Sequence, residues 1–418
     1  MVVAERLPSG LRLVTEAMPH VRSVTVGVWL TRGSRHESDA ESGVAHFVEH
    51  MLFKGTTSRS AQQIAQTIDS IGGQLDAFTA KEYASYYVKV LDEHLSLAID
   101  LLSDMVMRPA LAPADVTKEQ SVILEEIKMV EDAPDDLVHE VFAQQFWARH
   151  PLGRPILGTP ETVTSFESAG LRRYFDRTYT ASNLLVAAAG NFEHAAIRAL
   201  VDRAFGALPP GVPAEAGAPP AVTPGLVVRQ KDIEQSHICL GTPAYPQAHI
   251  DRHAMYVLNT ILGGSMSSRL FQHIREERGL AYAVFSNLTT YSDAGAITVY
   301  AGCAADRLNE VVDLTLAELR KLRSTAVPED ELRRAKDHLK GSLMLSLEST
   351  SSRMSQLARQ IMSFGQTFTL DETLDSIERV SAGDVLRVAQ DLFRDGAPVA
   401  TVVGPKLEQP LTVEQLKG

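Results

Sequence analysis

The stretch GALPPGVPAEAGAPPAVTPG, residues 206–225, decides how the chain is divided. It is rich in Pro, Gly and Ala, and it shows neither the period of a helix nor the alternation of a strand. Such a composition resists regular structure and is typical of an extended linker. We therefore predict two domains, over residues 1–208 and 226–418, with the linker proper at 209–225.

The two halves on either side of this linker repeat one order of predicted elements. Each half has a β-branched strand, a helix, a second strand with its helix, a charged helix, and a final helix and strand. These segments are 21–33, 42–54, 85–106, 114–132 and 161–192 in the first half, and 233–245, 252–264, 297–322, 327–350 and 371–404 in the second. A repeat of this length indicates two domains of one fold. Because adjacent strand runs also occur, we predict α+β domains, two homologous α/β sandwiches, rather than a purely parallel sheet.

The charge balance and the cysteines argue against several classes of protein. The 418-residue chain has 40 Lys+Arg against 52 Asp+Glu, a net charge of −12, whereas nucleic-acid-binding proteins usually carry a basic stripe. Cys239 and Cys303 form no CxxC pair, which argues against a disulfide framework or a cysteine zinc site. No apolar run approaches the roughly 20 residues that span a bilayer, and the N-terminus does not read as a signal or transit peptide. We expect a soluble, cytoplasmic protein without nucleic-acid or membrane partners.

The run GVAHFVEHMLFKGT, residues 43–56, places three polar side chains in an apolar helix. His46 and His50 stand four residues apart, so on a helix both imidazoles point to one side. Two neutral imidazoles with an oxygen ligand, and one position open to water, are the pattern of catalytic zinc. Glu49 lies beside them, where a carboxylate can act as a general base toward water. The motif HxxEH is the inverted form of HExxH.

The ends of this helix and its counterpart in the second half bear on that interpretation. Glu41 and Ser42 precede the run and are predicted to cap it, and Gly55 is predicted to follow its C-terminal cap. The equivalent stretch of the second half, MYVLNTILGGSMSS at 255–268, has neither a histidine nor an acid. A polar trio that the fold required would recur in both copies. We therefore interpret the trio as a functional site on one copy rather than as satisfied core residues.

A third metal ligand is expected from the charged stretch KEQSVILEEIKMVED, residues 118–132. Glu119 and Glu126 are two helical turns apart and share one face. Glu125 and Glu126 are adjacent and point in different directions, so at most one of them should reach the metal. The alternative interpretation of these glutamates is an ordinary solvated acidic face of a helix.

HFVEH together with a glutamate at position 126 resembles the pitrilysin family of zinc peptidases. The two-domain length resembles its mitochondrial-processing-peptidase-like branch, and the resemblance covers essentially the whole chain, including GGQLDAFTAKEYASYY, the linker and the repeated half. It implies that His46, His50 and Glu126 bind one Zn²⁺ ion per subunit. It also implies that Glu49 is the general base and that Glu119 is a supporting acid that orients a ligand.

The same resemblance implies a strand that binds the substrate. In LDAFTAKEYASYYVKV, residues 75–90, the positions Ala77, Phe78 and Thr79 match the strand edge that pairs with the peptide backbone. For Phe78 an ordinary core strand is the alternative interpretation.

Two donors in the second half are implied in the same way. In IREERGLAYAVFS, residues 274–286, Arg275 and Tyr282 match the pair that binds the scissile-region carbonyl and stabilises the developing oxyanion. The resemblance also implies a dimer, either a homodimer or a heterodimer with an inactive paralogue. Arg275 and Tyr282 would then act in trans, across the dimer.

We therefore predict a zinc-dependent endopeptidase that cleaves unstructured peptides or precursor segments inside an enclosed chamber, with Glu49 activating a zinc-bound water. The chamber is implied by the resemblance, and the acidic balance favours basic peptides. One rival is a non-catalytic peptide-binding or scaffold subunit of the same family, against which the intact ligand set and Glu49 argue. The other rival is a different zinc hydrolase, which a metal-dependent activity on non-peptide substrates alone would indicate.

Overall fold

The computed structural model describes residues 2–213, 217–394 and 398–417, and the chain divides into two compact units. The first unit comprises Met1–Lys128, Arg154–Gly217 and Leu345–Thr367, and the second comprises Met129–Gly153, Ala218–Met344 and Phe368–Gly418. Each unit thus takes one segment from the other half of the chain, an exchange that a linear division at the linker leaves out. Residues 214–216 of the predicted linker lie outside the described residues, and the described residues on either side of them form neither helix nor strand.

A six-stranded mixed sheet lies at the centre of the first unit, in the order β1-β2-β6-β3-β5-β4. β2 and β6 are parallel, and the other neighbouring strands are antiparallel. Its strands are β1 (Val2–Arg6), β2 (Arg12–Ala17), β3 (Ser23–Leu30), β4 (Gln74–Thr79), β5 (Ala84–Leu91) and β6 (Leu184–Gly190). Its helices are α1 (Val44–Leu52), α2 (Ala61–Asp69), α3 (Leu95–Met107), α4 (Pro113–Asp132, which continues into the second unit), α6 (Pro160–Ser165), α7 (Ser168–Thr178), α8 (His194–Phe205) and α12 (Thr350–Phe364).

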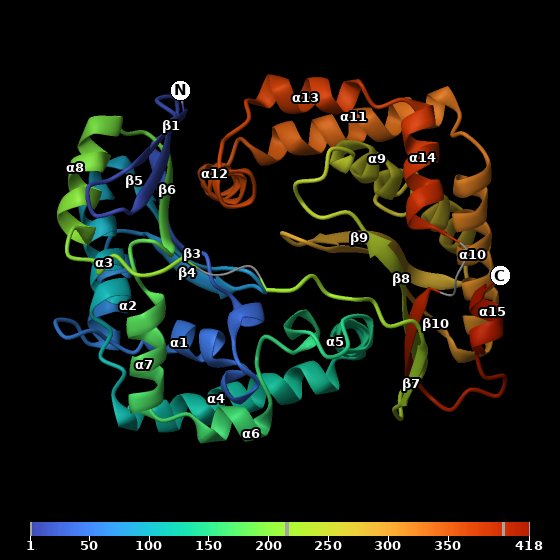
Figure 1. Cartoon of the computed structure of the whole chain (residues 1–418), viewed down its shortest axis with the longest axis horizontal. Coiled ribbons are helices and arrows are strands. Elements are labelled where there is room, and N and C mark those ends of the chain that lie inside the picture. Colours follow the sequence, from blue (N-terminus) through green and yellow to red (C-terminus); the bar gives the residue numbers. More distant parts are fainter. Residues whose placement is uncertain (1, 214–216, 395–397, 418) are drawn as a thin grey trace. The chain divides into compact units, whose positions relative to one another are not determined.

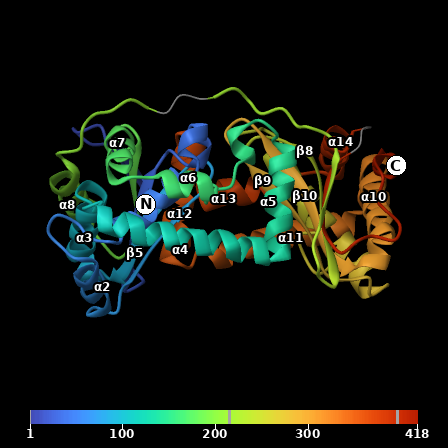
Figure 2. The ribbon, with the colours of Figure 1, turned by 90° about the horizontal axis from the view of Figure 1, so that it is seen from below.

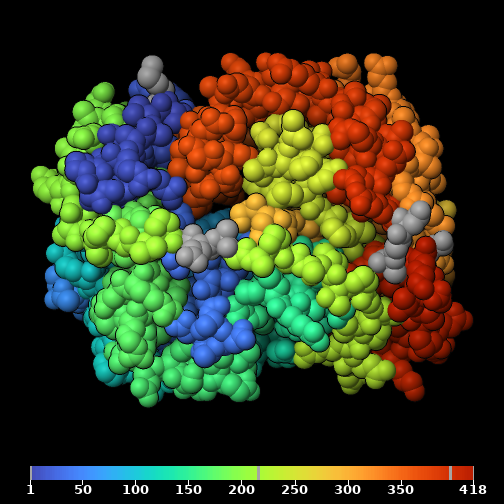
Figure 3. Space-filling model, in the orientation of Figure 1, coloured from blue at the N-terminus to red at the C-terminus, as the bar shows by residue number. Residues whose placement is uncertain are grey.

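Helices cover both faces of this sheet (Figure 1). α3 and α8 lie on one side and α12 lies on the other. The strand β3, SVTVGVWL, is buried on both faces from Val24 to Leu30. Alternate residues from Val24 to Leu30 enter one core cluster, and Trp29 enters the cluster beneath α12. At the surface in Figure 3 the N-terminal strands (dark blue) lie beside α8 (light green), where Glu5 contacts His194 and Arg198.

The second unit repeats this sheet with five strands, in the order β7-β11-β8-β10-β9, which corresponds to β2-β6-β3-β5-β4. β7 and β11 are again parallel and the other neighbours antiparallel. Its strands are β7 (Leu226–Gln230), β8 (Gln235–Ala244), β9 (Ala281–Thr290), β10 (Gly295–Ala304) and β11 (Val399–Gly404). Its helices are α5 (Pro134–Phe146), α9 (Arg252–Leu262), a π-helical turn (Phe271–Glu276), α10 (Leu308–Ser324), α11 (Glu329–Ser346, which ends in the first unit), α13 (Leu370–Glu378), α14 (Ala382–Leu392) and α15 (Val413–Lys417).

The two exchanged helices occupy equivalent places. α12, from the second half of the chain, packs on β2, β6 and β3 of the first unit, and α5, from the first half, packs on β7, β11 and β8 of the second. Figure 2 shows α5 beside β8. Gly27 permits the close approach of α12, because an added Cβ would lie 2.7 Å from Sδ of Met354.

The predicted fold class is confirmed, since each unit is a mixed α+β sandwich and the second repeats the strand order of the first. The predicted segments correspond to β3, α1, β5, α3, α4, α6, α7 and β6 in the first half and to β8, α9, β10, α10, α11, α13, α14 and β11 in the second. Among the described residues, every helix is too short or too polar to cross a bilayer.

Candidate metal centre

Helix α1 positions the HFVEH side chains. Its apolar residues from Val44 to Leu52 are buried in the core cluster that also contains the alternate residues of β3, which we call the main core. This burial fixes the helix on the sheet. The positions between them, His46, Glu49 and His50, stay half-buried on the remaining face. The helix is two residues shorter at each end than the predicted 42–54.

The predicted caps of α1 are wrong. Its N-cap is Gly43, with φ of 93°, and no side chain at that position can cap it. Glu41 instead pairs with Arg177 at 2.7 Å, and the hydroxyl of Ser42 is buried without a partner among the described residues. At the other end the C-cap is Phe53. The residue that follows the cap is therefore Lys54, and Gly55, the residue predicted for that place, is the next one.

Two imidazoles and one carboxylate converge beside α1. Nε2 of His46 lies 3.6 Å from one oxygen of Glu126, and Nε2 of His50 lies 3.6 Å from the other. The three ligand atoms lie within 4.8 Å of one another, and no other such group of three occurs among the described residues. A tetrahedral zinc ion with bonds of about 2.1 Å holds its ligand atoms about 3.4 Å apart. His46, His50 and Glu126 therefore fit one zinc ion, with one coordination position left open. The neighbouring Glu125 pairs instead with Lys128.

Glu119 lies between His50 and Lys54 and contacts both. Glu119 is almost fully buried, and one of its oxygens lies 3.0 Å from Nδ1 of His50 while the other lies 2.7 Å from Nζ of Lys54. A carboxylate paired with an ammonium only accepts hydrogen bonds, so Nδ1 of His50 donates and Nε2 keeps its lone pair toward Glu126. Sequence reasoning missed Lys54, although its place four residues after His50 was a usable signal.

His46 is held in its neutral form. Burial, and then the neighbouring imidazole of His50, lower the pKa of His46 to about 3. The two rings meet edge to face with centroids 4.6 Å apart. A neutral imidazole is the form that binds a metal, so His46 needs no deprotonation at ordinary pH.

Glu49 faces the same space from the next position on α1. Burial raises the pKa of Glu49, and a hydrogen bond of 2.5 Å from the hydroxyl of Thr79 opposes that shift. Thr79 is the last residue of β4, so the carboxylate is held between α1 and the end of that strand. A half-buried carboxylate with a raised pKa is suited to accept a proton.

The structure places the three predicted substrate residues along β4. β4 is the last strand of its sheet and pairs only with β5 among the described residues, so its outer edge carries backbone groups without a strand partner. Ala77 packs toward the main core. Phe78 is 37% exposed, and its ring meets the ring of Trp29 edge to face.

Arg275 and Tyr282 belong to the second unit, where they contact each other. The guanidinium of Arg275 lies 5.2 Å from the ring centroid of Tyr282 and 4.7 Å from that of Phe271. Arg275 sits in the π-helical turn, and Tyr282 near the start of β9 is 81% exposed. An Arg and an aromatic ring at this distance attract each other, so the two side chains form one exposed pair.

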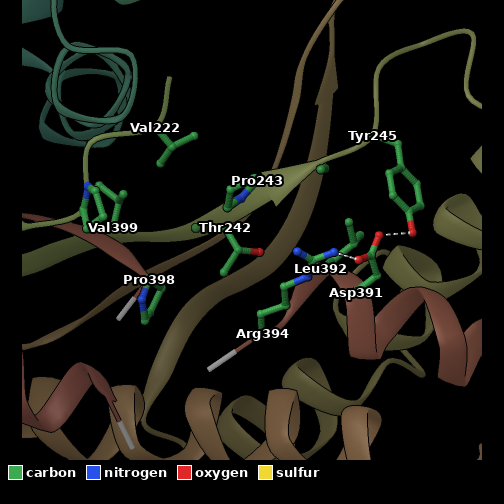
Figure 4. A pocket seen from close by; sticks show the side chains of 12 residues that line it. Val222, Thr242, Pro243, Tyr245, Asp391, Leu392, Arg394, Pro398 and Val399 are labelled. Carbon is green, nitrogen blue, oxygen red and sulfur yellow. Dashed lines mark hydrogen bonds and ion pairs between the residues drawn. The ribbon is translucent and has the colours of Figure 1, made fainter. Parts of the chain in front are cut away.

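The second unit also contains a cavity of about 480 Å³ (Figure 4). Its walls are mainly apolar and include Pro243 and Leu392, and on one side the hydroxyl of Tyr245 donates to Asp391 at 2.6 Å. Because the described residues of this lining bring no group of metal-ligating side chains together, the cavity is a feature separate from the metal centre.

Known proteins resemble this chain in sequence over almost its full length. The family model described as insulinase (peptidase family M16) matches residues 12–160, and the one described as peptidase M16 inactive domain matches 165–339. An uncharacterised zinc protease of Bacillus subtilis is 42% identical over 394 residues, which are 94% of this chain and 96% of that protein. Another from Mycobacterium tuberculosis is 42% identical over 421 residues, with 99% and 96% covered.

Solved structures show the same fold. A protease from Helicobacter pylori superposes with a TM-score of 0.89 at 22% identity, covering 97% of this chain and 100% of that one. A peptidase M16 inactive domain from Pseudomonas fluorescens superposes with a TM-score of 0.92 at 20% identity, covering 98% and 100%. With the family models and the curated relatives, the resemblance drawn from HFVEH is confirmed, and the chain belongs to peptidase family M16, the insulinase family.

Proposed function

We propose that this protein is a zinc-dependent endopeptidase of family M16 that cleaves unstructured peptides or precursor segments. The observation that carries the proposal is the convergence of His46, His50 and Glu126 within 4.8 Å, with Glu49 beside them. The metal is zinc, the ion named for the related proteases of Bacillus subtilis and Mycobacterium tuberculosis. When bound, zinc would supply Lewis-acid polarisation of the scissile carbonyl and of the attacking water.

The protein's own residues would hold the ion, orient its ligands and transfer the proton between water and the leaving amine. His46, His50 and Glu126 hold the ion, and Glu119 fixes the ring of His50. Glu49 takes a proton from the attacking water and passes it to the leaving amine, while Thr79 keeps the carboxylate aimed. Glu49 therefore acts first as a base, in its ionised form, and then as an acid, in its protonated form.

The free edge of β4 is the proposed place for the peptide backbone. An extended peptide that adds to an open strand edge forms main-chain hydrogen bonds whatever its sequence, which suits unstructured substrates. Ala77 and Phe78 would lie along that peptide, and Thr79 links the same strand to Glu49. A segment whose backbone is already paired within a folded protein would have to lose that pairing before it could add to this edge.

Arg275 and Tyr282 are proposed as donors to the carbonyl next to the cleaved bond, supplied across a dimer whose subunits enclose the site. A mixed dimer of Glu49→Gln with Arg275→Ala tests this. If the pair acts in trans, the mixture recovers activity over both parent homodimers. An absence of recovery would contradict the trans arrangement and favour action within one chain.

The proposed activity is tested with a pool of unstructured peptides. We expect cleavage that stops when a chelator removes the metal and returns when zinc is added back. Bound zinc without cleavage of any peptide would contradict the proposal and support the non-catalytic or scaffold role. Metal-dependent turnover of non-peptide substrates alone would identify a different zinc hydrolase.

A further inference from the structure

The segment over residues 31–42 joins β3 to α1 and is tied to the turn that follows β4. The N–H of Ser34 donates to the carbonyl of Ala80 at 3.2 Å, and the N–H of Arg35 donates to that of Lys81 at 2.8 Å. Ala80 comes directly after Thr79, the partner of Glu49. We call residues 31–42 the strap, and it connects the end of β4 to the beginning of the metal-binding helix.

Glu37 lies in the middle of the strap and is 5% exposed. One of its carboxylate oxygens accepts the N–H of Gly43 and the other accepts the N–H of Ala45, both at 2.8 Å. These are backbone groups at the start of α1, where a helix has no partners of its own. Arg154 holds the strap in place, since it donates to the carbonyl of Glu37 at 2.6 Å and to Asp39 at 2.6 Å.

The start of α1 cannot be capped locally, which is why a distant acid is needed. Gly43 has φ of 93°, and an added Cβ would lie 2.7 Å from the carbonyl oxygen of Leu157 and 2.8 Å from Cα of Gly158. The usual capping side chains, Ser, Thr, Asp and Asn, are therefore excluded at this position. Glu37 replaces them from six residues upstream.

We propose that Glu37 is a positioning residue of the metal centre, which sets the start of α1 relative to the end of β4. The same contact thereby fixes where His46 and Glu49 face their partners, Glu126 and Thr79. The inference rests on the proposed function only in taking zinc as the ion of this site.

The cost of burying this carboxylate argues against a purely stabilising role. Burial raises the pKa of Glu37 to about 7, and the two backbone donors, Arg154 and Lys81 only partly offset it. Since the folded pKa is above that of a free glutamate, the contribution of Glu37 to stability falls as pH rises toward 7. The two hydrogen bonds from the backbone to Glu37 are therefore better explained by the geometry that they impose on α1.

The test compares Glu37→Gln with Glu16→Gln in the full chain. Glu16 is a matched control, because it is also a largely buried glutamate of the first unit with two contacts to one partner, Arg353, which lies in α12. Zinc affinity is measured by competition with a chelator, and Tm is recorded for each variant. Amide exchange over residues 43–50 is measured in zinc-free protein.

Glu37→Gln is expected to weaken zinc binding about tenfold, as loss of a supporting partner usually does. An amide accepts one of the two N–H groups but turns its own NH₂ toward the other. Exchange over 43–50 should also become faster, whereas Glu16→Gln should change neither quantity beyond what its Tm predicts. Unchanged zinc affinity and exchange, or losses that follow Tm equally in both variants, would overturn the proposal. If the wild type binds no zinc, the proposed function fails, and the exchange comparison still decides whether Glu37 sets α1.

Discussion

Glu49 is the residue whose protonation should control the reaction. Its pKa is raised mainly by burial and lowered by the hydrogen bond from Thr79. As a base it works only when ionised, so kcat/KM should fall as pH decreases through the pKa that this carboxyl has in the zinc-loaded protein. In the zinc-free protein that pKa lies above that of an ordinary glutamate, and a bound Zn²⁺ ion would lower it.

Thr79→Val tests the cause of that fall. Removing the hydroxyl removes the lowering contact, so the acid limb of kcat/KM should move to higher pH. Thr67→Val is the matched control, since the Thr67 hydroxyl bonds the carbonyl of Gln63 on α2 and no other group in the described part of the chain. A limb that stays in place in Thr79→Val would show that this contact does not set the ionisation of Glu49.

Loss of the Glu119 carboxylate should weaken the binding of zinc itself. Glu119→Gln removes the charge that fixes the His50 tautomer, so zinc affinity should fall about 10- to 100-fold. Glu125→Gln on the same helix should leave affinity unchanged, because Glu125 is exposed and pairs with Lys128. Chelator competition on both variants measures this, and equal losses would contradict the assigned role of Glu119.

At the scale of residues, the sequence predicts the HFVEH side chains but does not predict the residues that hold their helix in place. HFVEH sits on a helix whose spacing alone brings His46 and His50 together. The choice of Glu126 over Glu125 came from resemblance, because two adjacent glutamates are alike in composition. Glu37 could not be predicted, since the need for a distant cap arises from the φ of Gly43 and from packing against residues 157–158.

Among the elements, α12 should be a large source of stability for the first unit. Met354 is fully buried between α12 and the sheet, where its Sδ accepts from Nε1 of Trp29 at 3.2 Å. Met354→Ala should lower the free energy of unfolding by about 2–5 kcal/mol. Met344→Ala, at a half-exposed methionine, should change it by about 0.5 kcal/mol or less. Denaturant unfolding compares the two, and equal effects would contradict the burial of α12.

Regular elements of the repeat are predictable because their periods are local. β3 shows a run rich in β-branched residues, and α10 and α11 show helical periodicity with charged faces. Which sheet a helix covers is not local information. Nothing in the sequences of α5 and α12 distinguishes packing on their own half from packing on the other.

For the molecule as a whole, the exchange of α5 and α12 makes the halves depend on each other. A chain ending at residue 208 would lack α12, and the sheet face with Trp29 and Leu185 would be uncovered. Such a fragment should bind a hydrophobic dye and lose cooperative unfolding, because a large apolar face stays in water. Cooperative unfolding of the fragment at the temperature of the full chain would show that the exchange is dispensable.

The most direct test of the zinc peptidase account is made on Glu49→Gln, with cleavage of unstructured peptides and bound zinc measured on the same sample. Glu49 touches Thr79 and is not one of the three converging groups, so the variant should keep its metal. The account predicts wild-type zinc content with cleavage reduced by about 10²- to 10⁴-fold, the range expected for loss of a general base. Cleavage that persists at the wild-type rate while zinc remains bound would contradict it.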